Sequence, residues 1–99
     1  MVEFNRGSFV AECFWPDVGD ADLVALDRRI ERVIAELATE RAVRYLGSIL
    51  MREDEVVLCQ FEGPAESVRA VAEQAEIPFE RILATVHSPW PLSRNGGPE

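Results

Sequence analysis

The sequence contains no lysine and a single histidine, His87, so all ten of its basic side chains are arginines. Against them stand 18 acidic residues, which give a net charge of −8 at pH 7. A surface this acidic repels the phosphate backbone of nucleic acids and the anionic leaflet of a membrane. We therefore expect no nucleic-acid partner and no membrane partner.

Cysteine is also scarce, since Cys13 and Cys59 are the only two and each lies within an apolar run. Two isolated thiols do not form the spaced framework of a disulfide-rich secreted module, and no Cys-x-x-Cys pair is present to chelate zinc. The first residues lack the layout of a signal peptide, and no run reaches the roughly 20 apolar residues of a membrane span. We expect reduced, buried thiols and a cytoplasmic protein.

The chain does have enough apolar material for a core. Hydrophobic residues make up 47% of its 99 residues, and a chain of this size can bury roughly 60 to 70% of the surface that its unfolded form exposes. We expect residues 1–87 to form a single domain. Residues 88–99 are rich in proline, glycine and polar residues, which predicts a loose C-terminal tail.

Four segments have the composition of β-strands, at residues 8–15, 43–50, 55–62 and 81–87. Two helices are predicted between them. The first begins near the capping residues Asp20 and Asp22, and the second begins with Pro64 at its first helical position. Their apolar stripes recur at every third or fourth residue: Leu23, Leu26, Ile30, Val33, Ile34 and Leu37, then Val68, Val71, Ala72 and Ala75.

This order of elements predicts an α+β fold of the ferredoxin-like kind. In such a βαββαβ sandwich, two helices cover one face of a four-stranded antiparallel sheet. The two middle strands form a hairpin around the polar residues 52–54.

The hairpin also predicts a homodimer. If its tip is centred on Arg52 and Glu53, one face carries Leu46, Ser48, Leu50, Val57, Cys59 and Phe61, and the other carries Val43, Tyr45, Gly47, Ile49, Val56, Leu58 and Gln60. Both faces are apolar, yet the helices can cover only one of them. Pairing the uncovered faces of two copies about a two-fold axis would give a dimeric α/β barrel with room for a ligand between the sheets.

The stretch VRYLGSILMREDEVVLCQFEGPAESV at residues 43–68, followed by IPFERI at residues 77–82, resembles a bacterial family of small domains of unknown function. Its named members are nickel-responsive proteins, and the resemblance extends over about residues 9–86. It implies a ferredoxin-like dimer and raises nickel (Ni2+) as a cofactor. The nickel-binding members are rich in histidine, whereas this chain offers only His87, so the resemblance assigns no ligand residue here.

Four polar residues form the candidate ligand site on the uncovered face. They are Glu12 on the first strand, Tyr45 opposite Gln60 in the hairpin, and Thr85 on the last strand. Because the first and third strands are central neighbours in this fold, we expect Glu12 to approach Gln60 and Thr85. Polar groups in an apolar cavity suit a small molecule. The alternative is that they are partners across a dimer interface or are solvated.

His87 is the default metal ligand or proton shuttle, because its ordinary pKa lies near neutrality. Two copies of His87, aided by Glu12, could form a site for a divalent metal such as nickel. The alternative is an exposed histidine at the end of a strand. Cys13 and Cys59 lie between apolar neighbours, which favours core packing over a role as nucleophiles.

Three functions are compatible with these features. The first is a homodimeric binding module that holds a divalent metal, nickel by resemblance, or a small apolar ligand between its sheets. The second is a cofactor-independent enzyme of the dimeric α/β barrel type, an oxygenase, isomerase or cyclase, with Glu12, Tyr45 or His87 as acid or base; fold analogy alone supports it. The third is a structural or regulatory interaction protein whose apolar face serves assembly.

Overall fold

The computed structural model describes residues 6–37 and 43–86, and these form a four-stranded sheet with two helices. The order is β1 (Arg6–Phe14), α1 (Asp20–Leu37), β2 (Arg44–Met51), β3 (Val56–Pro64), α2 (Ala65–Gln74) and β4 (Arg81–Thr85). All neighbouring strands are antiparallel, in the order β2-β3-β1-β4. The predicted ferredoxin-like α+β fold is confirmed. His87 and the predicted tail at residues 88–99 lie outside the described residues.

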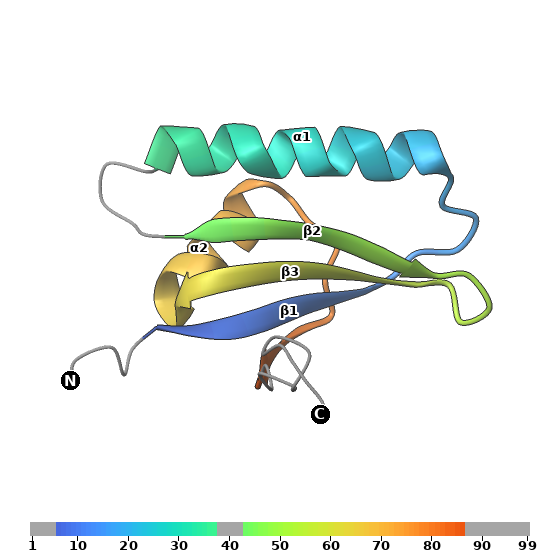
Figure 1. The fold of residues 1–99 in the computed structure, drawn as a ribbon. Helices are drawn as coiled ribbons and strands as arrows, with labels where there is room; N and C mark the ends of the chain where they lie inside the picture. The colour runs from blue at the N-terminus through green and yellow to red at the C-terminus, as the bar shows by residue number, and fades with distance from the viewer. Residues whose placement is uncertain (1–5, 38–42, 87–99) are drawn as a thin grey trace, which may run out of the picture.

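Both helices pack on the same face of the sheet (Figure 1), and the core lies between the two layers. Its buried side chains are Ala11, Cys13, Val57, Cys59 and Phe61 from the strands, Leu26, Ile30 and Val33 from α1, and Val68, Val71 and Ala72 from α2. The helices therefore bury the stripes that the sequence predicted. Pro64 precedes α2 as its cap residue, one position earlier than predicted. No helix among the described residues is long and apolar enough to cross a membrane.

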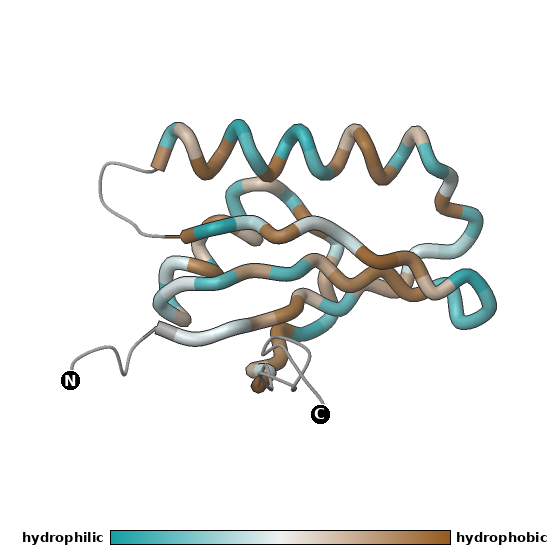
Figure 2. Tube along the Cα trace, viewed as in Figure 1, coloured by the Kyte–Doolittle hydropathy of each residue, from teal (hydrophilic) through white to brown (hydrophobic). Residues whose placement is uncertain are grey.

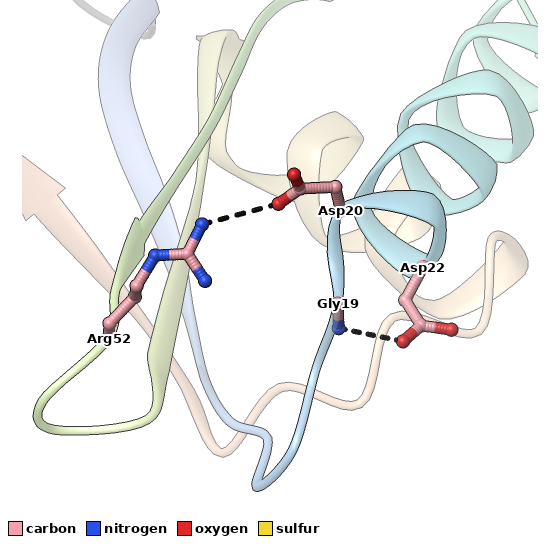
Figure 3. A network of polar contacts seen from close by, with 4 residues as sticks. All are labelled: Gly19, Asp20, Asp22 and Arg52. Atoms are coloured by element: carbon pink, nitrogen blue, oxygen red, sulfur yellow. Dashed lines mark hydrogen bonds and ion pairs between the residues drawn. The ribbon is translucent and has the colours of Figure 1, made fainter.

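The first turn of α1 closes its own N-terminus (Figure 3). The backbone amide of Gly19 donates to Asp22 Oδ2 at 2.8 Å, and the carbonyl of Gly19 accepts from the amide of Asp22 at 3.0 Å. An acidic residue that bonds back to the cap residue in this way supplies one half of a capping box. The sequence predicted this role for Asp20 or Asp22. Asp22 fills it, whereas Asp20 pairs with Arg52 at 3.3 Å.

Arg29 of α1 holds the C-terminal end of α2. Glu76 has a φ of 56°, and the amide of Ile77 donates to the carbonyl of Ala72 at 3.1 Å, which ends the helix as in a Schellman motif. The Arg29 guanidinium donates to the carbonyl of Ala75 at 2.6 Å and to that of Glu76 at 3.4 Å. A cation is favourable at the negative end of a helix. The contact therefore ties the two helices together.

The connection between β2 and β3 is a four-residue loop at residues 52–55, flanked by the paired residues Met51 and Val56. Glu55 closes the loop with a φ of 56°. The predicted tip was centred one residue earlier in the chain, so the predicted register is wrong: Ser48 lies opposite Cys59, two residues further along β3 than expected. A shift of two residues leaves each side chain on the same face. The predicted faces of β3 are therefore correct although the partners are not.

A β-bulge at the start of β2 reverses the face of the sheet to which the side chains before it point. Tyr45 pairs with Phe61 and Gly47 pairs with Gln60, so Leu46 is an extra residue on β2. Gly47 has a φ of 107°, which residues with a side chain rarely adopt. The prediction that Tyr45 lies on the uncovered face opposite Gln60 is wrong, because the extra residue reverses the alternation of side chains. Tyr45 lies on the helix-covered face.

Candidate functional site

Exposed apolar side chains gather on the face of the sheet that the helices leave uncovered. Among the described residues, six large apolar side chains are at least 38% exposed, and only Val24 lies on a helix. In Figure 2 the two hairpin strands are brown next to the loop that joins them, while the loop itself is teal. We call this surface the open face; its apolar members are Val10, Phe14, Leu46, Ile49, Met51, Val56, Leu58 and Leu83.

The charged side chains of the open face pair with one another. Arg81 Nε donates to Glu12 Oε1 at 2.5 Å, across β4 and β1. Arg44 Nη1 donates to Glu62 Oε1 at 2.9 Å, across β2 and β3. Two arginines and two glutamates cancel, so the described side chains of this face have no net charge although the chain has a net charge of −8. The open face is thus apolar and electrically neutral.

A hollow of about 320 Å³ opens on the open face. This volume is at the lower end of the range of roughly 300 to 1,000 Å³ found for small-molecule sites. The lining comes from all four strands and combines apolar and polar residues. The polar ones are Ser8, Gln60, Glu62 and Thr85, and the apolar ones are Val10, Leu46 and Val86, together with Phe9 and Phe61, whose side chains lie on the covered face.

The bulge in β2 shapes this hollow. Gly47 lies opposite Gln60 and has no side chain to cover it. A Cβ at Gly47 would meet no atom within 4 Å, so the space beside β3 is open. The extra residue, Leu46, lines the hollow instead. The same bulge that turns Tyr45 toward α1 therefore leaves Gln60 accessible.

Two of the four predicted ligand-binding residues meet in the hollow. Gln60 and Thr85 both line it, and Thr85 lies opposite Ser8 in the pairing of β1 with β4. Ser8 and Glu62 line it as well and were not predicted. The alternation along β1 that placed Glu12 on the open face also places Ser8 there, so the sequence held the signal for it.

Glu12 lies on the open face as expected, but outside the lining of the hollow. It lies opposite Leu58 on β3 and Arg81 on β4, and its carboxylate bonds to Arg81. Thr85 lies opposite Ser8, four residues from Glu12 along β1. This separation is about 13 Å at roughly 3.3 Å per residue. The expected approach of Glu12 to Thr85 is therefore wrong, because neighbouring strands alone do not fix the register.

Tyr45 belongs to a polar cluster beneath α1 and not to the hollow. Its hydroxyl donates to Asp27 Oδ1 at 2.5 Å, and the hydroxyl of Ser48 donates to the same oxygen at 3.1 Å. Its ring packs against Phe61 with 5.1 Å between the centroids. Burial and the hydrogen bond to Asp27 raise the pKa of the Tyr45 phenol above its ordinary value. The phenol therefore remains neutral and acts as a structural donor.

The predicted metal site of His87 and Glu12 stays a prediction, because His87 lies outside the described residues. Within those residues, no three histidine, cysteine, aspartate or glutamate side chains gather closely enough to hold a metal ion. Glu12 is also bonded to Arg81 and would have to leave it to bind a metal. The described side chains do not fit a nickel site.

Cys13 and Cys59 are fully buried on the covered face, and neither forms a disulfide. A hydrogen bond with the Cys13 thiol, together with burial, raises the pKa of the Cys59 thiol above its ordinary value. A protonated thiol in apolar surroundings is a poor nucleophile. The positions agree with the predicted role in core packing.

A second cavity, of about 160 Å³, lies where the connection from β1 to α1 meets the loop between β2 and β3. The backbone amide of Trp15 donates to the carbonyl of Glu55 at 2.8 Å and joins the two connections. The cavity has half the volume of the hollow, and its lining contains charges of both signs: Trp15, Asp17, Val18, Leu50, Arg52 and Glu55. We assign it to the packing of the two loops.

Comparison with known proteins supports the fold. The chain matches no family model and no curated protein. Among solved structures it is similar to the crystal structure of SCO4226 from Streptomyces coelicolor A3(2), with a TM-score of 0.67 and 19% sequence identity. The match covers 82% of this chain and 98% of that one. At this identity the likeness shows the fold alone.

Proposed function

We propose that the protein is a homodimeric binding module. Its open face pairs with the same face of a second copy and encloses a small, mostly apolar ligand. The observation that supports this proposal is the gathering of exposed apolar side chains on one neutral face that also contains the hollow. Pairing two such faces would remove the apolar surface from water and close the hollow against the second sheet.

The charge of the molecule favours a second copy as the partner on this face. A chain with a net charge of −8 repels other copies of itself. That repulsion is weakest at the open face, where Arg44 neutralises Glu62 and Arg81 neutralises Glu12. In a two-fold dimer each face meets its own copy, so a surface without net charge meets no net repulsion there.

The hollow favours a small organic ligand over a metal. Val10, Leu46 and Val86 give the hollow apolar walls, and its single carboxylate, that of Glu62, is bonded to Arg44. Hard and borderline cations need several oxygen, nitrogen or sulfur ligands. Apolar walls with a few polar groups are typical of sites for small organic molecules.

Catalysis receives less support from the described residues. Three groups were considered as acid or base. Tyr45 lies on the face opposite the hollow, Glu12 is bonded to Arg81, and His87 lies outside the described residues. The polar groups that line the hollow are two hydroxyls, one amide and one carboxylate in an ion pair. These groups can bind a ligand through hydrogen bonds, but none of them is a free acid or base for catalysis.

The pairing is tested by placing a glutamate on each side of the sheet. Ile49 on the open face and Val24 on α1 are 45% and 48% exposed, so Ile49→Glu and Val24→Glu add the same charge at equally accessible positions. We expect the parent protein and Val24→Glu to be dimers, and Ile49→Glu to be a monomer. Sedimentation and native mass spectrometry measure the oligomer, and the mass also reveals a retained ligand.

A monomeric parent protein, or an Ile49→Glu variant that remains a dimer, would contradict the pairing. If the parent is a monomer and a chain ending at residue 86 is a dimer, then the protein's own C-terminal segment occupies the open face. A dimer whose sheets pack without a cavity would leave assembly as its function.

A further inference from the structure

We infer that the ligand in the hollow is an uncharged, mostly apolar molecule with one carbonyl or hydroxyl group, recognised by the side-chain amide of Gln60. The inference rests on the proposed function, and it adds the chemical class of the ligand and the residue that selects it. Its basis is the charge, the hydrogen-bonding groups and the size of the hollow.

The described charges around the hollow are unfavourable to both kinds of ion. None of the nine residues that line it is an arginine, and the nearby Arg44 guanidinium is bonded to Glu62 at 2.9 Å. An anion would therefore enter a strongly acidic molecule in which no described side chain at the hollow offers a free cation to receive it. A cation would have to compete with Arg44 for Glu62, the single carboxylate of the lining. A neutral ligand meets neither obstacle.

Gln60 is the polar group in the centre of the open face. It lies on β3 between Gly47 of β2 and Val10 of β1, and it lines the hollow. Within the described residues, its side chain makes no hydrogen bond. When a second copy covers this face, the amide loses water and needs a new partner. A ligand carbonyl or hydroxyl can provide one, because the amide both donates and accepts.

The two other neutral polar groups lie together. Ser8 and Thr85 are paired residues of β1 and β4, and both line the hollow. Their hydroxyls can donate or accept, so they suit an uncharged polar group as well. The apolar side chains of the lining are those of Val10, Leu46 and Val86. With a volume of about 320 Å³, the hollow accommodates a molecule of two fused rings.

A matched series of naphthalene compounds tests the class of ligand. The probes are naphthalene, 2-naphthalenemethanol, 2-naphthoate and 2-naphthylmethylammonium, which share one ring system and differ in charge and hydrogen bonding. We expect the alcohol to bind the parent protein at least about tenfold more tightly than either charged probe. Calorimetry gives the affinities, and amide NMR shifts should centre on Ser8, Gln60 and Thr85.

Two substitutions test the role of Gln60. Gln60→Leu should weaken binding of the alcohol by about fivefold and leave the affinity for naphthalene unchanged or higher. The matched control is Gln74→Leu, which removes an exposed amide at the end of α2 and should change neither affinity. Gln60→Glu should move the preference toward the ammonium probe. Circular dichroism checks that each variant is folded.

Tighter binding of a charged probe to the parent protein would overturn the inference, and so would the failure of all four probes to bind. An equal loss for naphthalene and the alcohol in Gln60→Leu would show that Gln60 only shapes the hollow. The oligomer is measured in the same samples. A monomer that keeps the preference contradicts the pairing alone, whereas a dimer that binds no probe contradicts the ligand alone.

Discussion

Phe61 and Phe14 lie on opposite faces of one sheet. Phe61 is completely buried beneath the helices, and Phe14 is 53% exposed on the open face. The strands supply apolar side chains to both faces. On the covered face, the stripes of α1 and α2 meet them; on the open face, the described residues of the chain supply no such layer. The comparison shows that apolar side chains identify a face that is stabilised by burial. They do not identify which partner buries it.

The polar groups of the two faces differ in the same way. On the covered face, Asp27 of α1 accepts hydrogen bonds from Tyr45 and Ser48. On the open face, Gln60 makes no side-chain hydrogen bond with any described residue. A polar group that will be buried needs a partner. The polar groups of the covered face thus have partners in the layer that covers them, whereas Gln60 on the open face has none among the described residues.

Replacing one phenylalanine on each face should give the largest difference. Phe61→Ala removes a fully buried ring, and we expect the free energy of unfolding to fall by about 3 to 5 kcal/mol. Phe14→Ala removes a ring that is half exposed, and its cost in the monomer should be about 1 kcal/mol or less. Urea unfolding at low protein concentration measures both. Equal losses would contradict the assignment of the two faces.

The second effect concerns the bulge in β2, which reverses the alternation of side chains between the two faces. Gly47→Ala should lower the free energy of unfolding by about 1 to 3 kcal/mol, because a φ of 107° is strained for any residue with a side chain. Space does not limit the substitution, since no atom lies within 4 Å of the added Cβ. Gly47→Ser should therefore cost about as much. If serine costs far more than alanine, crowding and not backbone strain explains the loss.

The third effect depends on pH and asks which face Tyr45 occupies. Burial and the bond to Asp27 raise the pKa of this phenol in the folded state, so the folded protein keeps a proton that the unfolded chain loses above about pH 10. The stability is complete below that pH and should fall above it by up to about 1.4 kcal/mol per pH unit. Comparison with Tyr45→Phe isolates this slope from that of the thiols.

Tyr45 is the chain's only tyrosine, so its titration can also be followed directly by tyrosinate absorbance. We expect no tyrosinate in the folded protein until it unfolds. A phenol on the open face would instead titrate near its ordinary pKa of about 10, and that result would restore the arrangement that the sequence predicted.

Much of the fold could be predicted from periodicity. The spacing of Leu26, Ile30 and Val33 identified the buried side of α1, and the alternation of Val57, Cys59 and Phe61 identified the covered side of β3. Both patterns are local, because a helix or a strand places its side chains with a fixed period. The order of the elements then left few arrangements, and the ferredoxin-like one was correct.

The candidate site was predicted only in part, because it depends on local exceptions and on register. An extra residue at Leu46 moved Tyr45 to the other face, and Gly47 was the only signal of it in the sequence. Glu55, with its left-handed backbone, belongs to the loop and not to β3 as predicted, so the loop lies one residue later in the chain and the partners of β2 shift. The ion pair of Glu12 with Arg81 joins residues 69 positions apart. This ion pair forms only in one register of β1 against β4, and the composition of the two strands does not predict that register.

The bond from Arg29 to the end of α2 has a consequence for cooperativity. It joins residues 46 positions apart and stabilises the two helices only when both are docked. Loss of either helix removes the partner of the other, so the layer should open as a unit. A partly opened chain would present apolar surface on both sides of one sheet, the kind of species that aggregates. By linking the helices, Arg29 keeps that species rare while the open face remains available.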